Sequence, residues 1–95
     1  MAKLSGAMGV TTWQYDGEVS LGQPNGKGKM IFSDGDVVEG SFINGTPNGH
    51  CSYTYANGDE YRGSLVNGKR DGYGIYTHAD GFQEIGMWER NEFIG

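Results

Sequence analysis

The fold is decided by a stretch that reads Tyr61-Arg62-Gly63-Ser64-Leu65-Val66-Asn67-Gly68-Lys69-Arg70-Asp71-Gly72-Tyr73-Gly74-Ile75-Tyr76-Thr77-His78-Ala79-Asp80-Gly81. Its glycines recur along the chain at intervals of 23 residues (63 − 40, for example), so that Gly63 has counterparts at Gly17, Gly40 and Gly86. Further rows with this spacing are Gly26, Gly49, Gly72 and Gly95; Gly35, Gly58 and Gly81; and Gly22, Gly45 and Gly68. Gly28 and Gly74 are two periods apart, with Cys51 at the position between them. A fixed period of this length indicates one supersecondary unit that is copied along the chain.

Each period contains two turn signals, which predict two strands per unit. Asn25-Gly26, Asn48-Gly49 and Asp71-Gly72 predict one reversal, and Asp34-Gly35, Asn57-Gly58 and Asp80-Gly81 predict the other. This turn density leaves strands of roughly 5 to 7 residues, and no window has the apolar spacing of a helix. We therefore expect an all-β fold, an elongated and twisted single-layer antiparallel meander of tandem 23-residue β-hairpin repeats with about seven strands.

Alternation along the strands sorts the side chains onto two faces of this sheet. Tyr61, Gly63 and Leu65 share one face, whereas Arg62 and Ser64 share the other. The first face also collects the large rings Phe42, Tyr53, Tyr55, Tyr76 and Trp88. Because glycine carries no side chain, neighbouring rings can lie over its backbone and the strand can bend there. We expect this face to be concave.

The quoted stretch closely resembles the MORN repeat, the membrane occupation and recognition nexus motif. The resemblance implies repeats over 15–37, 38–60 and 61–83 and a partial repeat over 84–95. We expect 1–14 to be a loose lead-in whose residues 11–13 join the first strand. The chain departs from the family at Val38 and Glu84, where tyrosine is usual; at Val19 and Leu65, where Trp or Phe is commoner; and at Cys51, a glycine position.

The amino-acid composition limits which partners and which cellular compartment we expect. The net charge is −5, from 12 acidic against 7 basic residues, and the only basic clusters are Lys27 with Lys29 and Lys69 with Arg70. A protein that binds the phosphate backbone of a nucleic acid needs more clustered Lys and Arg residues than these, so we expect no nucleic-acid partner. A single cysteine excludes an internal disulfide, and no 18-residue apolar run is present. We expect a reducing, cytoplasmic setting, with peripheral association at a membrane or the cytoskeleton as a further expectation.

Catalytic and metal-ligating patterns do not emerge. His50 and His78 have no nucleophile at a suitable spacing, and Cys51 points to the opposite face from its neighbour His50. Asp34-Gly35-Asp36 lacks the remaining ligands of a calcium loop. We expect no enzyme activity, no cofactor and no metal. Cys51 reads as a small replacement for glycine, so Cys51→Gly is expected to be neutral or mildly stabilising.

Binding is the function that this pattern favours. We expect a non-enzymatic scaffold that holds a peptide or amphipathic helix of a partner protein along the concave aromatic face. The expected partner-binding residues are Phe42, Tyr53, Tyr55, Tyr61, Tyr76 and Trp88, flanked by the acidic residues Glu39, Asp59, Glu60 and Glu84. Acidic flanks favour a basic partner segment.

Two alternatives to a free-standing scaffold stay open. The resemblance implies that such repeats also serve as targeting or regulatory segments of larger enzymes, as beside a phosphatidylinositol phosphate kinase or a histone lysine methyltransferase domain. It also implies phospholipid binding, which the acidic composition does not favour. Separately, the strand over 85–89 is expected to leave unpaired backbone groups, which a homodimer through this C-terminal edge would cover.

Overall fold

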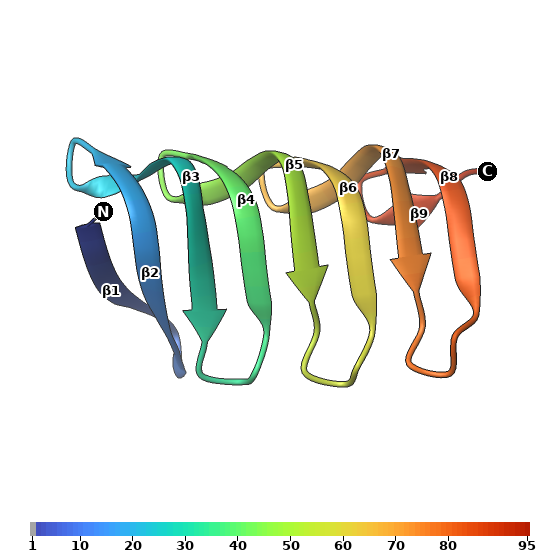
Figure 1. The fold of residues 1–95 in the computed structure, drawn as a ribbon, viewed down its shortest axis with the longest axis horizontal. Coiled ribbons are helices and arrows are strands. Elements are labelled where there is room, and N and C mark those ends of the chain that lie inside the picture. Colours follow the sequence, from blue (N-terminus) through green and yellow to red (C-terminus); the bar gives the residue numbers. More distant parts are fainter. Residues whose placement is uncertain (1) are drawn as a thin grey trace.

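A computed structural model describes residues 2–95 as one antiparallel sheet in which every strand pairs with its neighbours in the sequence (Figure 1). The strands are β1 (Ala2–Met8), β2 (Thr11–Ser20), β3 (Gln23–Phe32), β4 (Val37–Ile43), β5 (Thr46–Thr54), β6 (Glu60–Val66), β7 (Lys69–Thr77), β8 (Gln83–Glu89) and β9 (Glu92–Phe93). The sheet measures 37 × 23 × 22 Å. The predicted all-β meander of tandem hairpins is confirmed, but over residues 2–95 it has nine strands rather than about seven, because β1 and β9 add one strand at each end.

Each repeat reverses at a two-residue turn, and both turn residues have positive φ, from 46° to 86°. These turns are Leu21-Gly22, Asn44-Gly45, Asn67-Gly68 and Arg90-Asn91. Two consecutive positive φ angles define the hairpin turn that matches the natural strand twist. The reversal predicted at Asn25-Gly26 and its copies is therefore wrong: these pairs lie within β3, β5 and β7, four residues further on (25 − 21).

The displaced glycines bend the strands instead of reversing them. Gly26, Gly49 and Gly72 have φ of 97°, 100° and 96°, so the predicted positive φ is confirmed. Between the pairs Gly17↔Gly28 and Val19↔Pro24, three residues of β3 stand opposite one residue of β2, and the next two repeats have the same irregularity. A bulge bends its strand and increases the local twist. Because the bulges recur in alternate strands, the sheet curls over near the top of Figure 1.

The second reversal of each repeat is confirmed at Asp34-Gly35, Asn57-Gly58 and Asp80-Gly81. All three loops close with the same contact, in which the glycine N–H donates to the carbonyl three residues earlier at 2.8–3.0 Å. β4, β6 and β8 have 7 residues, within the predicted length, whereas β2 has 10 and β3, β5 and β7 have 9 or 10; the last three are longer because they run on through their bulges.

Both ends of the described chain are more ordered than we expected. Residues 2–8 are not a loose lead-in but form β1, which pairs along its whole length with β2. At the other end, residues 92–95 fold back onto β8: Phe93 pairs with Trp88, and the Ile94 N–H donates to the Met87 carbonyl at 2.9 Å. The upper part of the edge expected to be open over 85–89 is thus covered by the chain itself.

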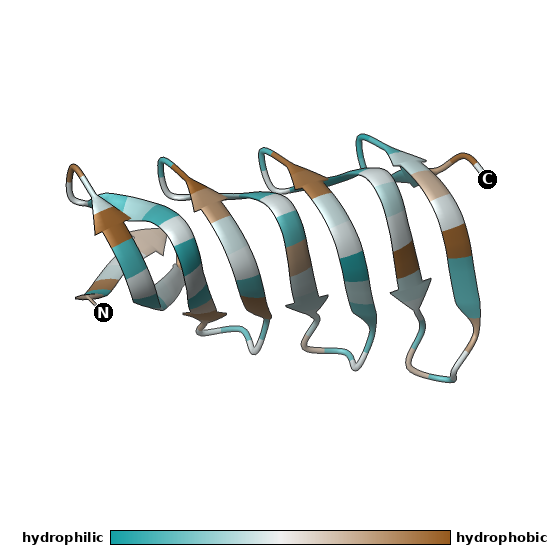
Figure 2. Cartoon of the chain, turned by 45° about the horizontal axis from the view of Figure 1, so that its top comes forward, coloured by the Kyte–Doolittle hydropathy of each residue, from teal (hydrophilic) through white to brown (hydrophobic). Residues whose placement is uncertain are grey.

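The core lies on the predicted aromatic face, which we call the inner face. Its buried apolar side chains are Tyr15, Met30, Val38, Phe42, Cys51, Tyr61, Leu65 and Trp88. The opposite, outer face carries Ile31, Ile43, Val66, Tyr73, Ile85 and Met87, which are between 44% and 59% exposed. Figure 2 shows the resulting bands of apolar and polar residues along each strand. One curved layer therefore shields its core mainly by packing side chains of adjacent strands on one face.

Candidate binding face

Tyrosine rings that lie over glycines form the floor of the inner face. The ring of Tyr15 covers Gly28, and the ring of Tyr61 covers Gly74, so that a Cβ atom at either glycine would collide with the ring. The hydroxyl of Tyr15 donates to the Glu18 carbonyl at 2.7 Å, and that of Tyr61 donates to the Ser64 carbonyl at 2.8 Å. Burial raises the pKa of Tyr61 to about 12. Both hydroxyls are thus engaged and neutral.

The middle repeat reaches the same arrangement with different residues. Val38 takes the place of the tyrosine, and Cys51 takes the place of the glycine beneath it. The Cys51 thiol fills the space and donates to the Ser41 carbonyl at 3.3 Å, the acceptor equivalent to Glu18 and Ser64. Burial raises the pKa of this thiol. Two departures from the repeat pattern therefore compensate each other in volume and in hydrogen bonding, and Cys51 is packed rather than reactive.

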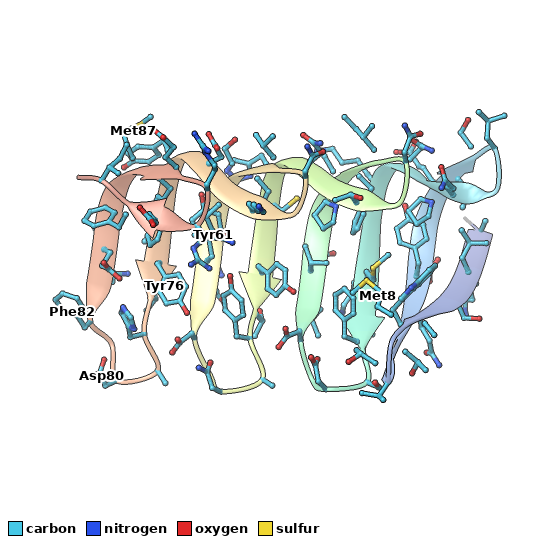
Figure 3. All side chains as sticks on the ribbon, turned by 180° about the vertical axis from the view of Figure 1, so that it is seen from behind. Met8, Tyr61, Tyr76, Asp80, Phe82 and Met87 are labelled. Carbon is cyan, nitrogen blue, oxygen red and sulfur yellow. The ribbon has the colours of Figure 1, made fainter. Side chains whose placement is uncertain are left out.

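Further rings form a row across consecutive strands of the inner face. Tyr53 stacks on Tyr55 with ring centres 4.5 Å apart, Tyr55 lies 5.6 Å from Tyr76, and Tyr76 lies 5.8 Å from Trp88. Figure 3 looks onto this face and shows Tyr61 and Tyr76 on it, whereas Met87 projects away from the upper rim.

The structure divides the six expected binding residues into two groups. Phe42, Tyr61 and Trp88 are 1%, 0% and 4% exposed, so they pack inside the sheet. Tyr53, Tyr55 and Tyr76 are half-buried, and their rings border the inner face. Trp13 and Phe32, which we did not single out, lie at the N-terminal end of the same face as a cross-strand pair.

Arg70 also belongs to the inner face, which the sequence reading missed. Its guanidinium donates to the Tyr55 hydroxyl at 2.8 Å and to the Asn91 carbonyl at 2.9 Å. It lies 5.0 Å from the ring centres of both Tyr76 and Trp88. A cation over aromatic faces is attracted by their negative π surfaces. Charge clustering alone predicts Lys69 and Arg70 as one basic pair, whereas the alternation of β7, which turns Lys69 outward and Arg70 inward, is the signal that separates them.

The contact between Arg70 and the Arg90-Asn91 turn, which we call the third junction, differs from the contacts that Pro24 and Pro47 make with the equivalent turns. Two substitutions in it compensate each other. Arg70 stands where Pro47 and Pro24 stand one and two repeats earlier, respectively, and it has an N–H that proline lacks. That N–H donates to the side-chain oxygen of Asn91 at 2.8 Å, and Asn91 stands where the other turns have glycine. The backbone contact itself is unchanged: Asn91 N–H donates to the Arg70 carbonyl at 2.9 Å, as Gly68 does to Pro47.

Aspartates tie the loops of successive repeats together beside the tyrosine row. Asp59 accepts the Ala79 N–H at 2.8 Å and the Tyr76 hydroxyl at 2.6 Å. Asp36 accepts the Ala56 N–H at 2.8 Å and faces the Tyr53 hydroxyl at 3.4 Å. The hydrogen bond from Tyr76, followed by that from Ala79, lowers the pKa of Asp59.

The expected acidic flanks are on two different faces. Asp59 lies beside the inner face, and so does Glu84, which stands opposite Tyr76 in the sheet and contacts His78 at 2.8 Å. Glu39 and Glu60 instead lie on the outer face, opposite Lys29 and beside Arg62, respectively. The reason is alternation, because each directly adjoins a buried inner-face residue, Val38 or Tyr61.

A cavity of ≈ 240 Å³ opens at the N-terminal end of the inner face. Its lining residues are Met8, Trp13, Met30, Phe32, Gly45, Thr46, Pro47, Tyr53 and Gly68. A larger depression of ≈ 540 Å³ over β1 to β3 is lined largely by polar and charged side chains, including Lys3, Asp16 and Lys29. Only the smaller cavity continues the row of half-buried rings.

Within residues 2–95, no three His, Cys, Asp or Glu side chains gather closely enough to hold a metal ion. No helix in the same part of the chain is long and apolar enough to cross a membrane.

The fold and the ring-over-glycine floor define a class, the all-β tandem hairpin repeat proteins. Within it the chain belongs to the MORN repeat family, whose repeat matches residues 15–37, 39–60 and 61–83 in succession. No curated protein matches the chain.

Proposed function

We propose that this chain is a non-enzymatic binding module whose inner face receives a basic peptide or amphipathic helix of a partner protein. The observation that carries the proposal is the row of half-buried rings, which begins at an open cavity beside Trp13 and Phe32 and runs through Tyr53 and Tyr55 to Tyr76. Rigid aromatic side chains offer contact area at a low entropy cost.

The state of the tyrosines indicates which atoms a partner would contact. The Tyr76 hydroxyl is held by Asp59 and the Tyr55 hydroxyl by Arg70. These contacts fix the rings and leave ring faces and edges, rather than hydroxyl groups, for a partner. A pre-organised surface of this kind loses little conformational freedom on binding.

Charge supports a basic partner. The protein carries a net charge of −5, and Asp36, Asp59 and Glu84 lie along the inner face or its loop rim. Opposite charges accelerate encounter and are screened by salt, so association with a basic segment should slow as ionic strength rises.

Selection of peptides from a random library tests the proposal. Peptides of about 12 residues are long enough, because an extended chain of that length spans roughly 40 Å, comparable with the 37 Å sheet. We expect selection on the immobilised chain to enrich sequences that combine Arg or Lys with large apolar residues. Their binding should weaken as salt rises.

A matched pair of variants locates the binding face. Tyr53→Ser, on the inner face, should raise the dissociation constant of selected peptides by about tenfold or more. Tyr73→Ser makes the same chemical change on the outer face, where Tyr73 is 59% exposed, and should leave binding unchanged. Equal binding to both variants would place the peptides elsewhere and contradict the proposal.

Anionic vesicles provide the second arm of the test. We expect no co-sedimentation with vesicles that contain phosphatidylserine at about 0.15 M salt, where surface attraction is screened beyond roughly 8 Å. Vesicle binding without peptide enrichment would favour a lipid ligand and overturn the proposal.

A further inference from the structure

The open cavity and the Arg70 site are the same place in successive repeats. Subtracting one period of 23 residues converts Arg70 to Pro47, Tyr76 to Tyr53 and Tyr55 to Phe32. Asn91, whose carbonyl accepts from the guanidinium, becomes Gly68. Pro47, Tyr53, Phe32 and Gly68 all line the cavity. The third repeat therefore shows an occupied form of the site that the second repeat leaves open.

Two substitutions explain why the second site is empty. Pro47 has no long side chain to enter it, and Leu65 stands where Trp88 closes the third site. The resulting volume of ≈ 240 Å³ lies below the roughly 300 Å³ at which small-molecule pockets begin, so it suits one inserted side chain.

The electrostatic surroundings of the two sites also differ. Burial raises the pKa values of Tyr55, Tyr61 and Tyr76, and the positive charge of Arg70 partly opposes this rise. At Tyr53, burial raises the pKa, and Asp36 and Asp34 raise it further, without an opposing contribution from a cation. The open site is thus an aromatic pocket in a negative field.

We propose that the cavity formed by Trp13, Phe32 and Tyr53 accepts one arginine or lysine side chain of the partner protein, in the position that Arg70 takes one repeat later. The proposal rests on the proposed function, because it names the chemistry of one contact on the same inner face.

Arginine fits this pocket better than lysine. Its planar guanidinium stacks on ring faces while its N–H groups donate in the plane, as Arg70 does between Tyr76, Trp88 and two oxygen acceptors. In the open pocket, the Gly68 carbonyl occupies the backbone position of the Asn91 carbonyl. Phe32 lacks the hydroxyl that Tyr55 offers, so ring contacts and the carbonyl carry recognition.

The two tryptophans report separately on the two sites. Trp13 lines the open cavity, whereas Trp88 lies against Arg70. Titration with N-acetyl-arginine amide should shift the indole N–H signal of Trp13 in a saturable way in two-dimensional NMR spectra, and should leave that of Trp88 in place. N-acetyl-citrulline amide, which has nearly the same shape without the charge, should bind about fivefold or more weakly, because a cation over a ring is favoured by about 1 kcal/mol.

A self-filling variant supplies the matched control. Pro47→Arg combined with Gly68→Asn copies the third junction into the second repeat, and asparagine suits this turn because Gly68 has φ of 79° and Asn91 has φ of 73°. The inserted side chain should occupy the cavity and abolish the Trp13 shift. Ile43→Arg adds the same charge on the outer face and should retain the shift. Tyr53→Ser removes one wall of the cavity. In the otherwise unaltered chain it should weaken binding of the arginine derivative and reduce the Trp13 shift.

The proposal is overturned if the arginine derivative causes no saturable Trp13 shift, or if the citrulline derivative binds equally well to the unaltered chain. Its failure is distinct from that of the proposed function. Selected peptides that lose inner-face binding in Tyr53→Ser, yet tolerate replacement of each Arg and Lys by a neutral residue, would support the binding module and refute the cationic subsite. Absence of any selected peptide would instead count against the module.

Discussion

At the residue scale, the pair Val38 and Cys51 shows how one repeat tolerates two departures from the pattern. In the flanking repeats, a tyrosine ring covers a glycine and its hydroxyl caps a carbonyl. In the middle repeat, the Cys51 side chain fills the space and its thiol caps the equivalent Ser41 carbonyl. The sequence alone does not show that Cys51 and Val38 compensate each other, and with this geometry we expect Cys51→Gly to be destabilising rather than neutral.

We predict that Cys51→Gly destabilises the fold by roughly 1–3 kcal/mol, because it leaves a cavity and an uncapped carbonyl. Val38→Tyr alone should cost a similar amount, because the ring overpacks the buried cysteine. Together the substitutions rebuild the tyrosine-over-glycine pair, so the double variant should be more stable than the sum of the single effects by about 1 kcal/mol or more. Urea unfolding midpoints of the four proteins measure this coupling. Additive effects would show that the two positions do not compensate.

Asp59 predicts a specific loss of stability in acid. Its pKa lies below the ordinary value of 3.8, so its contribution is complete above that value and disappears as the pH falls through the lower, folded pKa. The variant Tyr76→Phe removes the largest cause of the shift, and should flatten the dependence of the unfolding free energy on pH in this window. Thermal unfolding between about pH 2 and 5 measures both slopes. An unchanged slope would mean that the Tyr76 contact does not tune this carboxylate.

At the element scale, the bulges at Gly26, Gly49 and Gly72 set the curvature of the sheet. We predict that Gly49→Ala destabilises by about 1 kcal/mol or more. The φ of 100° disfavours any side chain, and the new Cβ would meet the Cβ of Ser41 at 3.3 Å. Asn48→Ala, at the neighbouring residue without positive φ, should have a smaller effect on the urea midpoint. The reverse order would show that the bulge does not depend on glycine.

The 23-residue period and the strand alternation were enough to predict the meander, the faces and the identity of most core residues. They did not place the hairpin turns, because the second repeat contains Asn44-Gly45 and Asn48-Gly49 and both satisfy the local preference for positive φ. Cross-strand pairing decides between them: Ile43 pairs with Thr46 and closes the tighter hairpin around the first pair. The local sequence therefore cannot show which of the two Asn-Gly pairs forms the hairpin turn, because strand register decides it.

The binding face was predictable only in part for the same reason. Alternation correctly gave one face to all six rings, but it did not reveal how deeply each ring is buried. Phe42, Tyr61 and Trp88 became core because the bulged strands curl over them, and this curvature depends on geometry that accumulates over several strands. The role of Arg70 depends on ring positions two strands away and on Asn91, 21 residues along the chain.

At the scale of the whole molecule, we expect the exposed edges of the sheet to control self-association. Residues 92–95 cover the upper part of β8, and their removal would uncover backbone groups that can pair with a second copy. We predict that a chain ending at Asn91, which keeps the partner of Arg70, forms dimers more readily than the full chain as concentration rises. Light scattering over a concentration series measures the difference. If both chains remain monomeric throughout, the proposed pairing through this edge fails.

Because the strands follow one another in sequence order, the number of repeats also sets the length of a partner helix that the inner face could contact. Neighbouring strands are about 4.8 Å apart, so each two-strand unit lengthens the inner face by roughly 10 Å. An α-helix laid along it rises about 1.5 Å per residue and takes roughly 6 to 7 residues to cover that distance, close to a heptad. A partner helix that repeats its anchors every two turns would keep pace with successive units, whereas anchors in an adjacent phase would drift off the rings. Adding one repeat would lengthen the contacted part of such a helix by about 6 to 7 residues, and the existing contacts would keep their chemistry.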